Sequence, residues 1–193
     1  YEEDDDYRER LLSFIRKDDF GSIGYYMDLA NKVDGVHDSL LVDEAGYTKK
    51  VLVNGDVKPT PDTVLAAVLE QFTDTNNIVI NHTFTVDSPD YVIATLTVNL
   101  TVSVELDEDL ILDALTTFFN GGSGSESMVE YDGLWIGESV SKSKLYEVFF
   151  MIDGVEDVEV IDGSTGEEVT TLSVEDEEVL KLGTVTINQT TGS

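Results

Sequence analysis

A short pattern that occurs twice constrains the fold of this chain more than any other feature. The runs Val33-Asp34-Gly35-Val36 and Ile152-Asp153-Gly154-Val155 align at a constant offset. Apolar residues precede each run at helical spacing, and after each run they alternate with polar residues, as in a strand. Because glycine adopts left-handed backbone angles at little cost, the pattern predicts a helix that ends at a glycine C-cap and passes directly into a strand. We expect two structurally equivalent units.

The segments around the two runs predict further helices and strands. Thr60 is placed to cap a helix in which Pro61 takes the first position, and the apolar stripe of that helix extends to Phe72. The segment 91–105 alternates apolar and polar residues, which indicates a long half-buried strand. A helix over 110–119 follows it, then a flexible loop over 121–125, and the segment 179–187 is again typical of a strand.

This order of elements favours an α+β fold over a doubly wound fold, because hairpins as well as crossovers join the strands. We expect mixed or antiparallel sheets packed by helices, arranged as two subdomains. The first, 1–106, would contain an N-terminal helix, and the second, 107–193, would end in a strand-rich tail.

The chain is strongly acidic, with 40 Asp and Glu against 11 Lys and Arg in 193 residues and a formal charge of −29. Phosphate binding needs a cationic face, so nucleic acid is excluded as a partner, and docking on an anionic membrane is disfavoured. No run of 18 apolar residues exists, so direct membrane insertion is not expected. Such a surface favours a protein from a halophile, since salt screens its self-repulsion. An acidic protein from an ordinary host and a calcium-binding protein are the alternatives.

The chain contains no cysteine, which excludes a disulfide framework and a thiolate zinc site. It begins at Tyr1 without methionine, in an acidic run that extends to Asp6. We therefore expect it to be a piece of a longer polypeptide. The acidic run lacks the alternating carboxylates and the central glycine of a calcium-binding EF-hand loop.

No catalytic or cofactor site is predicted. His37 and His82 lie in or beside predicted strands without metal-ligand spacing, and the glycines over 121–124 match no phosphate-binding motif. Carboxylates are so abundant that no single pair indicates an acid–base dyad. We therefore expect a protein that is not an enzyme and that holds neither metal nor cofactor. Three matches to the glycosylation acceptor pattern begin at Asn81, Asn99 and Asn188, and they matter only in a glycosylating compartment.

Several short motifs occur together in a fixed order: the acidic-Tyr-Arg-x-Arg run over 4–11, Gly21-Ser22, the first Asp-Gly-Val run, the helix from Pro61, Pro89-Asp90-Tyr91-Val92, and the second Asp-Gly-Val run. In this order they resemble the baseplate J-like family, the wedge proteins of contractile-tailed viruses and related contractile injection systems. The resemblance covers nearly the whole chain. The N-terminal region of the family is absent here, and extreme acidity is not general in the family.

The resemblance implies an architectural role without catalytic residues. Copies of the chain would form baseplate wedges around the central hub and would contact other copies, hub proteins and sheath proteins. The location would be a virion tail baseplate or an injection particle, assembled in the host cytoplasm. The alternative is an adhesin-like or surface-layer β-rich domain of a halophile, although a β-sandwich has no reason to carry two helix-turn-strand units. A carboxylate hydrolase would need a convergent pocket that the sequence does not indicate.

An assembling protein needs apolar contact residues on its surface. Tyr131, Trp135 and the loop from Gly121 to Met128 form the least patterned segment of the chain, so we predict contacts there. Alternatively, this segment folds back as a hairpin and the acidic N-terminal helix makes the contacts.

Overall fold

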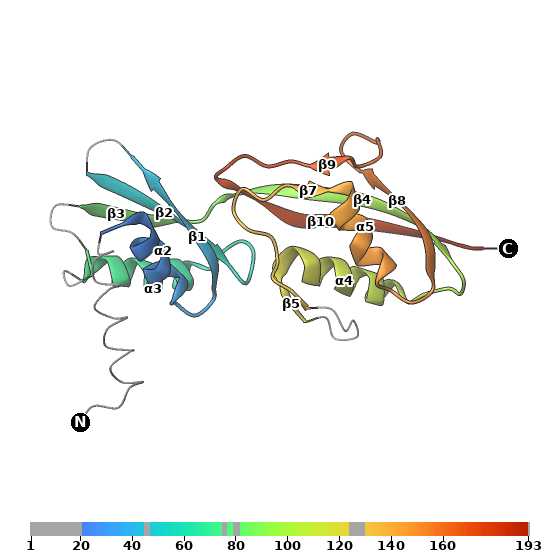
Figure 1. The fold of residues 1–193 in the computed structure, drawn as a ribbon, viewed down its shortest axis with the longest axis horizontal. Helices are drawn as coiled ribbons and strands as arrows, with labels where there is room; N and C mark the ends of the chain where they lie inside the picture. Colours follow the sequence, from blue (N-terminus) through green and yellow to red (C-terminus); the bar gives the residue numbers. More distant parts are fainter. Residues whose placement is uncertain (1–20, 45–46, 75–76, 79–81, 124–129, 193) are drawn as a thin grey trace, which may run out of the picture. The chain divides into compact units, whose positions relative to one another are not determined.

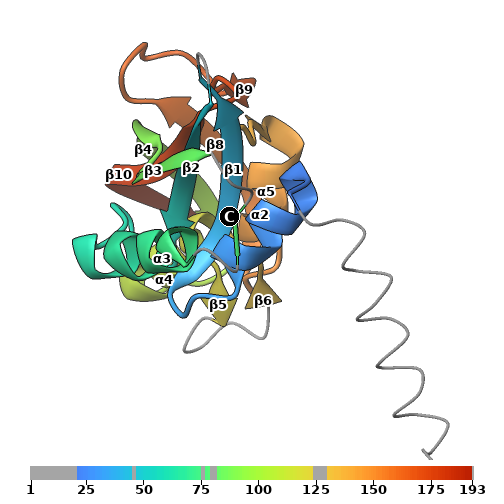
Figure 2. The same ribbon diagram turned by 90° about the vertical axis from the view of Figure 1, so that its left-hand side faces the viewer.

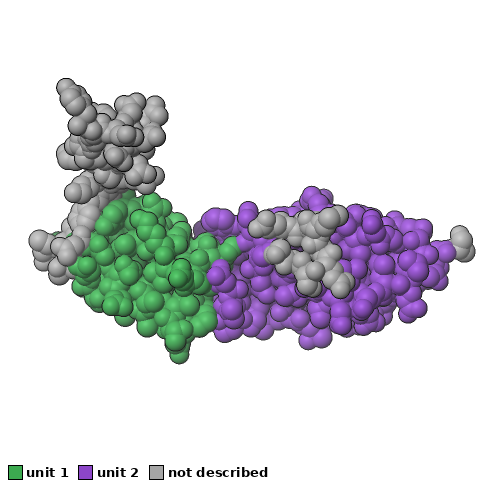
Figure 3. Space-filling model, turned by 90° about the horizontal axis from the view of Figure 1, so that it is seen from below, with its two compact units in different colours: residues 1–55, 60–88 green, residues 56–59, 89–193 purple. Residues whose placement is uncertain are grey.

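The computed structural model describes residues 21–44, 47–74, 77–78, 82–123 and 130–192. The chain divides into unit 1, Tyr1–Gly55 with Thr60–Ser88, and unit 2, Asp56–Pro59 with Pro89–Ser193; Figure 3 shows them in green and purple. Both contain helices and a mixed sheet, so the predicted α+β class is confirmed. This division precedes residue 106, because the long predicted strand belongs to unit 2. Independent subdomains over 1–106 and 107–193 stay a prediction.

In its described residues, unit 1 consists of a three-stranded sheet with two helices (Figure 1). In chain order its elements are α2 (Ile23–Asn31), β1 (Val36–Asp43), β2 (Thr48–Gly55), α3 (Asp62–Thr73) and β3 (Thr83–Asp87). The central strand β2 pairs antiparallel with β1 and parallel with β3. Both helices pack into one core with the strands: the rings of Tyr26 (α2) and Phe72 (α3) lie 4.8 and 4.7 Å from that of Phe84 (β3), and Figure 2 gives a second view of these elements.

Unit 2 contains a second three-stranded sheet, in the order β10-β4-β8. Its main elements are β4 (Asp90–Val102), α4 (Glu108–Asn120), α5 (Lys142–Phe150), β8 (Val155–Asp162) and β10 (Glu178–Thr191), and its two-residue strands are β5 (Gly122–Ser123), β6 (Glu130–Tyr131), β7 (Val140–Ser141) and β9 (Thr171–Leu172). The predicted alternation of β4 is confirmed, since its residues Ala94, Leu96, Val98, Leu100 and Val102 are all buried. They pack against α4 and α5 in one core.

The two repeated segments are built alike from the helix N-cap to the strand. Ser22 and Ser141, at the same offset as the glycines, accept hydrogen bonds from the N–H groups of Tyr25 and Lys144 at 3.1 and 3.4 Å. Helices α2 and α5 both have 9 residues, and strands β1 and β8 both have 8. The two buried positions of α2, Tyr26 and Ala30, correspond to the buried Leu145 and Phe149 of α5, which buries Val148 in addition.

The glycines of the repeat lie in turns, so their predicted role as helix C-caps is wrong. The helices end earlier, with Lys32 and Met151 as C-caps. A β-turn then follows, closed by the Val36 N–H on Val33 O at 3.1 Å in the first copy and by the equivalent bond at 3.3 Å in the second. Gly35 (φ +86°) is the third residue of its turn, as Gly154 (φ +96°) is of the second. A type II turn needs positive φ at that position, so glycine is still required.

The repeat also organises the two sheets. Strands β1 and β8, which follow the repeated turn, pair antiparallel with the central strands β2 and β4. The other neighbour of each central strand, β3 in unit 1 and β10 in unit 2, is parallel to it. The chain order differs, because β2 follows β1 whereas β4 precedes β8. The two units therefore share one arrangement of strands around the central strand, although the chain visits those strands in a different order in each unit.

A pair of glycine substitutions in unit 1 tests this account of the turn. Gly35→Ala should lower the free energy of unfolding by about 1–2 kcal/mol, because alanine in the left-handed region brings Cβ close to the carbonyl oxygen. The added Cβ would also lie 3.1 Å from Val64 Cγ2. Gly24→Ala, inside α2, would place its Cβ 3.9 Å from Ser22 Oγ, an ordinary contact, and should instead stabilise by up to about 1 kcal/mol. Urea unfolding of the two variants measures both changes; effects of equal sign would contradict the turn assignment.

Two smaller expectations also need correction. Thr60 does not cap α3: Pro61 is the N-cap residue and makes no side-chain cap bond. The Thr60 hydroxyl is buried, donates to Val53 O at 2.7 Å and accepts from the Gly55 N–H at 2.9 Å, so it fixes the end of β2. Gly122–Ser123, in the segment expected to be a flexible loop, pairs antiparallel with Glu130–Tyr131, as the alternative of a hairpin predicts, while residues 124–125 lie outside the described residues.

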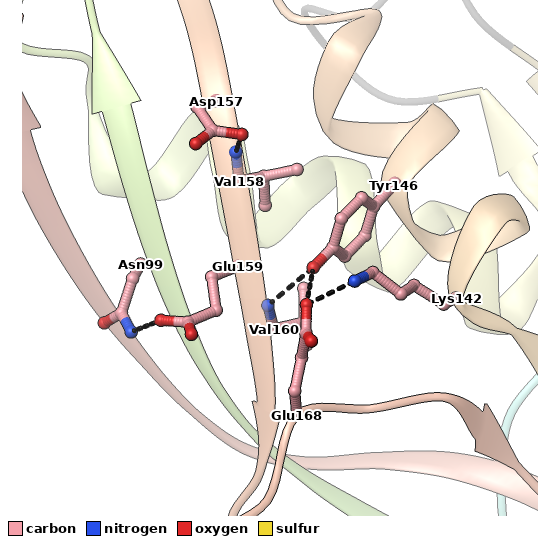
Figure 4. A network of polar contacts seen from close by, with 8 residues as sticks. All are labelled: Asn99, Lys142, Tyr146, Asp157, Val158, Glu159, Val160 and Glu168. Carbon is pink, nitrogen blue, oxygen red and sulfur yellow. Dashed lines mark hydrogen bonds and ion pairs between the residues drawn. The ribbon is translucent and has the colours of Figure 1, made fainter.

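A polar network joins α5 to its neighbours (Figure 4). The Tyr146 hydroxyl donates to Glu168 Oε1 at 2.9 Å and accepts from the Val160 N–H at 3.4 Å, while Lys142 forms an ion pair with Glu168. The hydrogen bond between Lys142 and Glu168 lowers the pKa of Glu168 and raises the pKa of Lys142. Burial is the main cause that raises the pKa of Tyr146. The network therefore ties the repeat helix to β8 and to the segment after it.

Candidate interaction surface

A groove of about 230 Å³ opens on unit 2 and is lined by residues of α4, of α5 and of the segment between β6 and β7. We call it the aromatic groove. Its lining residues are Phe118, Tyr131, Asp132, Gly133, Trp135, Glu138 and Lys144.

Two glycines allow the backbone segments beneath the aromatic groove to touch. A Cβ on Gly133 (φ +81°) would lie 2.7 Å from Gly121 N, and a Cβ on Gly121 (φ +85°) would lie 2.9 Å from Asp132 O. The Leu134 N–H donates to Phe119 O at 3.3 Å across the same contact. This close approach holds the groove segment on the end of α4, with Leu134 fully buried beneath it.

Aromatic rings form the apolar part of the groove. Phe118 and Tyr131 meet edge to face, with ring centroids 5.3 Å apart, a favourable geometry for an aromatic pair. The Tyr131 hydroxyl contacts Met151 Sδ at 3.5 Å, and burial, followed by the nearby charge of Glu147, raises the pKa of Tyr131. Trp135 remains 49% exposed, so the largest apolar side chain of the groove is available to a partner.

Three charged side chains line the groove, Asp132, Glu138 and Lys144, and two of them form an ion pair. Lys144 pairs with Glu138, and its Nζ lies 5.7 Å from the centroid of the Phe118 ring, within cation–π range. Glu138 also accepts a hydrogen bond from the Trp135 N–H at 3.0 Å, while its own N–H donates to Trp135 O at 3.1 Å. These bonds fix the backbone at Trp135 and therefore restrict where its indole can lie.

Lys58, in the segment 56–59 of unit 2, binds the backbone of residues next to those that line the groove. Its Nζ donates to Phe119 O at 2.6 Å and to Leu134 O at 3.3 Å, and the residue is only 9% exposed. A charged donor on two carbonyls is a strong contact, worth roughly 1.5–3 kcal/mol per bond. Lys58 thus fastens together the two segments that form the groove.

The sequence analysis names two of the residues that line the groove and does not name the others. Tyr131 and Trp135, predicted as contact residues, both line the groove, while Met128 and the acidic N-terminal helix lie outside the described residues. Contact with a partner stays a prediction for all of them. Phe118 was read only as part of a helix, and no pairing was assigned to Glu138 and Lys144. The scarcity of cations was the available signal, since Lys144 is one of only 11.

Other kinds of site find no support in the part of the chain that the structure describes. No group of three or more His, Asp and Glu side chains there could hold a metal ion. None of the described helices combines the length and apolarity that crossing a lipid bilayer requires. Asn99 and Asn188, from the glycosylation pattern, lie on β4 and β10 and bond to each other at 2.8 Å, whereas Asn81 lies outside the described residues.

The fold is of the α+β class, and unit 2 carries the aromatic groove. No family model and no curated protein matches the chain. Among solved structures, it is similar to a chain in the six-fold symmetrised cryo-EM structure of the anti-feeding prophage baseplate, with a TM-score of 0.50 and 11% sequence identity. The alignment covers 81% of this chain and 36% of that one, so the chain spans about a third of its neighbour's length. At this identity, the likeness shows a shared fold.

Proposed function

We propose that this chain is a structural component of the baseplate of a contractile tail or injection particle. The observation that carries the proposal is the fold shared with a baseplate chain over 81% of the residues. The ordered sequence motifs point to the same class independently of the structure. The chain would act as a wedge protein, with several copies in a ring around the tail hub and in contact with sheath and peripheral proteins.

The aromatic groove supports an assembling role rather than catalysis. Its half-exposed tryptophan, backed by Phe118 and Tyr131, provides the kind of aromatic anchor that concentrates binding energy in protein interfaces. Two of its three charged side chains, Glu138 and Lys144, are paired with each other, and the third, Asp132, is a carboxylate without a base beside it in the lining. An adhesin-like β-sandwich is disfavoured, because helices form one core with each sheet.

Imaging of particles tests the proposal directly. The chain, carrying a terminal tag, would be expressed in the organism that encodes it, and particles would be purified in the salt of that organism. Labelled antibody should mark a ring at one end of a sheathed particle in electron micrographs. A chain that sediments apart from all particles, or that lies elsewhere on the cell surface, would refute the baseplate role.

A groove substitution gives the corresponding quantitative prediction. Trp135→Ala should reduce incorporation into particles at least about tenfold, because loss of a central aromatic anchor costs about 2 kcal/mol or more of binding. Tyr47→Ala is the matched control, since Tyr47 is an exposed aromatic residue of unit 1, 71% exposed. Quantitative immunoblots of particle fractions measure both. Equal incorporation of the two variants would show that the groove makes no contact in the particle.

A further inference from the structure

Among the strands that the structure describes, none lies beside the outer edge of β10. Strand β10 is the first in the sheet order β10-β4-β8, and beyond the irregularity between Leu182 and Val185 its described residues pair only with β4. Before that point the edge is partly covered, since the Gly137 N–H donates to Glu178 O at 2.8 Å. We call residues 184–191 the β10 edge.

One hydrogen bond shows which backbone groups of the β10 edge point outward. The Gly192 N–H donates to Val102 O at 3.0 Å, on the β4 side. Backbone groups alternate between the two sides of a strand, and the register is continuous from Val185 onward. The outward N–H and C=O groups therefore belong to Val185, Ile187, Gln189 and Thr191.

The β10 edge lacks the features that usually prevent strands from pairing with other chains. Natural edges carry charges, prolines or bulges. There is no charged residue and no proline in residues 184–191, Thr-Val-Thr-Ile-Asn-Gln-Thr-Thr. The pairing of this segment with β4 is regular. The segment lies in a stretch, 179–193, without a single carboxylate, although the whole chain has 40. The outer edge of the same sheet differs, because β8 is acidic and bonds to the segment after it through the Val169 N–H on Val160 O.

We propose that the β10 edge is a self-association site, where β10 pairs antiparallel with β10 of a second copy of this chain. The charge distribution favours a second copy as the occupant. Two copies of charge −29 repel each other over most of their surface, but across the β10 edge only Thr, Val, Ile, Asn and Gln face one another. A two-fold axis makes such a contact self-complementary in every register that places the outward residues of the two copies opposite one another. The inference deepens the proposed baseplate function by naming one contact between copies.

Single cysteines test this pairing without disturbing the fold. The chain has no cysteine, and the side chains of Thr184, Thr186, Asn188 and Thr190 are exposed. Each would be replaced by Cys, and the variants would be oxidised alone and in pairwise mixtures at about 1 M salt, where screening is strong. Facing positions should cross-link at least about tenfold more than the exposed control Ser173→Cys, since cysteines with Cα atoms more than about 7 Å apart cannot bridge.

Sedimentation equilibrium provides the second readout. The unsubstituted chain should dimerise in a concentration-dependent way below about 100 µM, and Ile187→Pro should raise the dissociation constant at least about tenfold. Proline there removes an outward N–H and leaves the bonds to β4 in place. A cooperative thermal transition shows that this variant folds, and the cysteine variants keep the test decisive if it does not.

A chain that stays monomeric up to about 100 µM and cross-links no better than the control would overturn the self-association site. Dimers unaffected by Ile187→Pro, with no cross-linking along the edge, would also overturn it by placing the contact elsewhere. Either result leaves the baseplate proposal intact, because imaging of particles tests that proposal separately. Absence from particles, conversely, would refute the baseplate proposal without touching the pairing measured with the purified chain.

Discussion

The unfolding temperature of this chain should rise by on the order of 10 °C when KCl is raised from about 0.1 M to about 1 M. The formal charge of −29 repels itself more in the compact state than in the expanded one, so screening favours the folded protein. The screening length falls from about 10 Å to about 3 Å over this range. Most of the gain should therefore appear below about 1 M, whereas salting-out by sulfate would continue to grow at higher concentrations. Differential scanning calorimetry in both salts separates the two effects.

A charge-neutralising double variant provides the control for this salt effect. Asp176→Asn with Glu177→Gln removes two exposed carboxylates from the turn before β10. It should raise the unfolding temperature in about 0.1 M KCl and change it little in about 1 M KCl, where the repulsion is already screened. A chain equally stable at both salt concentrations would contradict the interpretation that its surface is adapted to salt, while leaving the fold and the baseplate proposal unaffected.

The second large effect is expected inside the repeat helix α5. Phe149→Ala should lower the free energy of unfolding of unit 2 by about 3–5 kcal/mol, because Phe149 is fully buried in the core and its removal leaves a cavity. Phe150→Ala changes the same residue type one position along, where the ring is 52% exposed, and should cost less than about 1 kcal/mol. The only tryptophan, Trp135, lies in unit 2, so its fluorescence during urea unfolding reports on this unit. Similar losses for the two variants would show that α5 presents a different face to the core.

The sequence predicted those parts of the fold that local patterns determine. The alternating residues of β4 were sufficient to predict that strand, and the two Asp-Gly-Val runs were sufficient to predict glycines with positive φ, because both signals act over a few residues. Helix ends were less predictable: Val33 continues the apolar spacing of α2, yet it opens the β-turn. The short strands β5, β7 and β9 were not predicted, because two-residue pairings leave no period in the sequence.

The candidate surface was predictable only in part. Tyr131 and Trp135 were found because they lie in a segment without a core pattern, which left their side chains available for the surface. Phe118 could not be assigned there, because its helix also buries Phe119 and spacing alone does not show which aromatic ring reaches the edge of the core. The pairing of β10 with β4 was also beyond the sequence, since strands so far apart in the chain are brought together by the core and not by any local signal.

Lys58 shows why an acidic chain retains particular cations. Phe119 O, which accepts its shortest hydrogen bond, belongs to the last turn of α4, and that turn contains no basic residue of its own. The C-terminus of a helix carries a partial negative charge from its macrodipole, which a cation stabilises. Lys58 therefore stabilises the C-terminus of α4, although it lies far from this helix in the sequence. Such a protein tolerates acidic residues in place of lysines at many surface positions. At position 58, an acidic residue would place a full negative charge beside the negative end of a helix dipole.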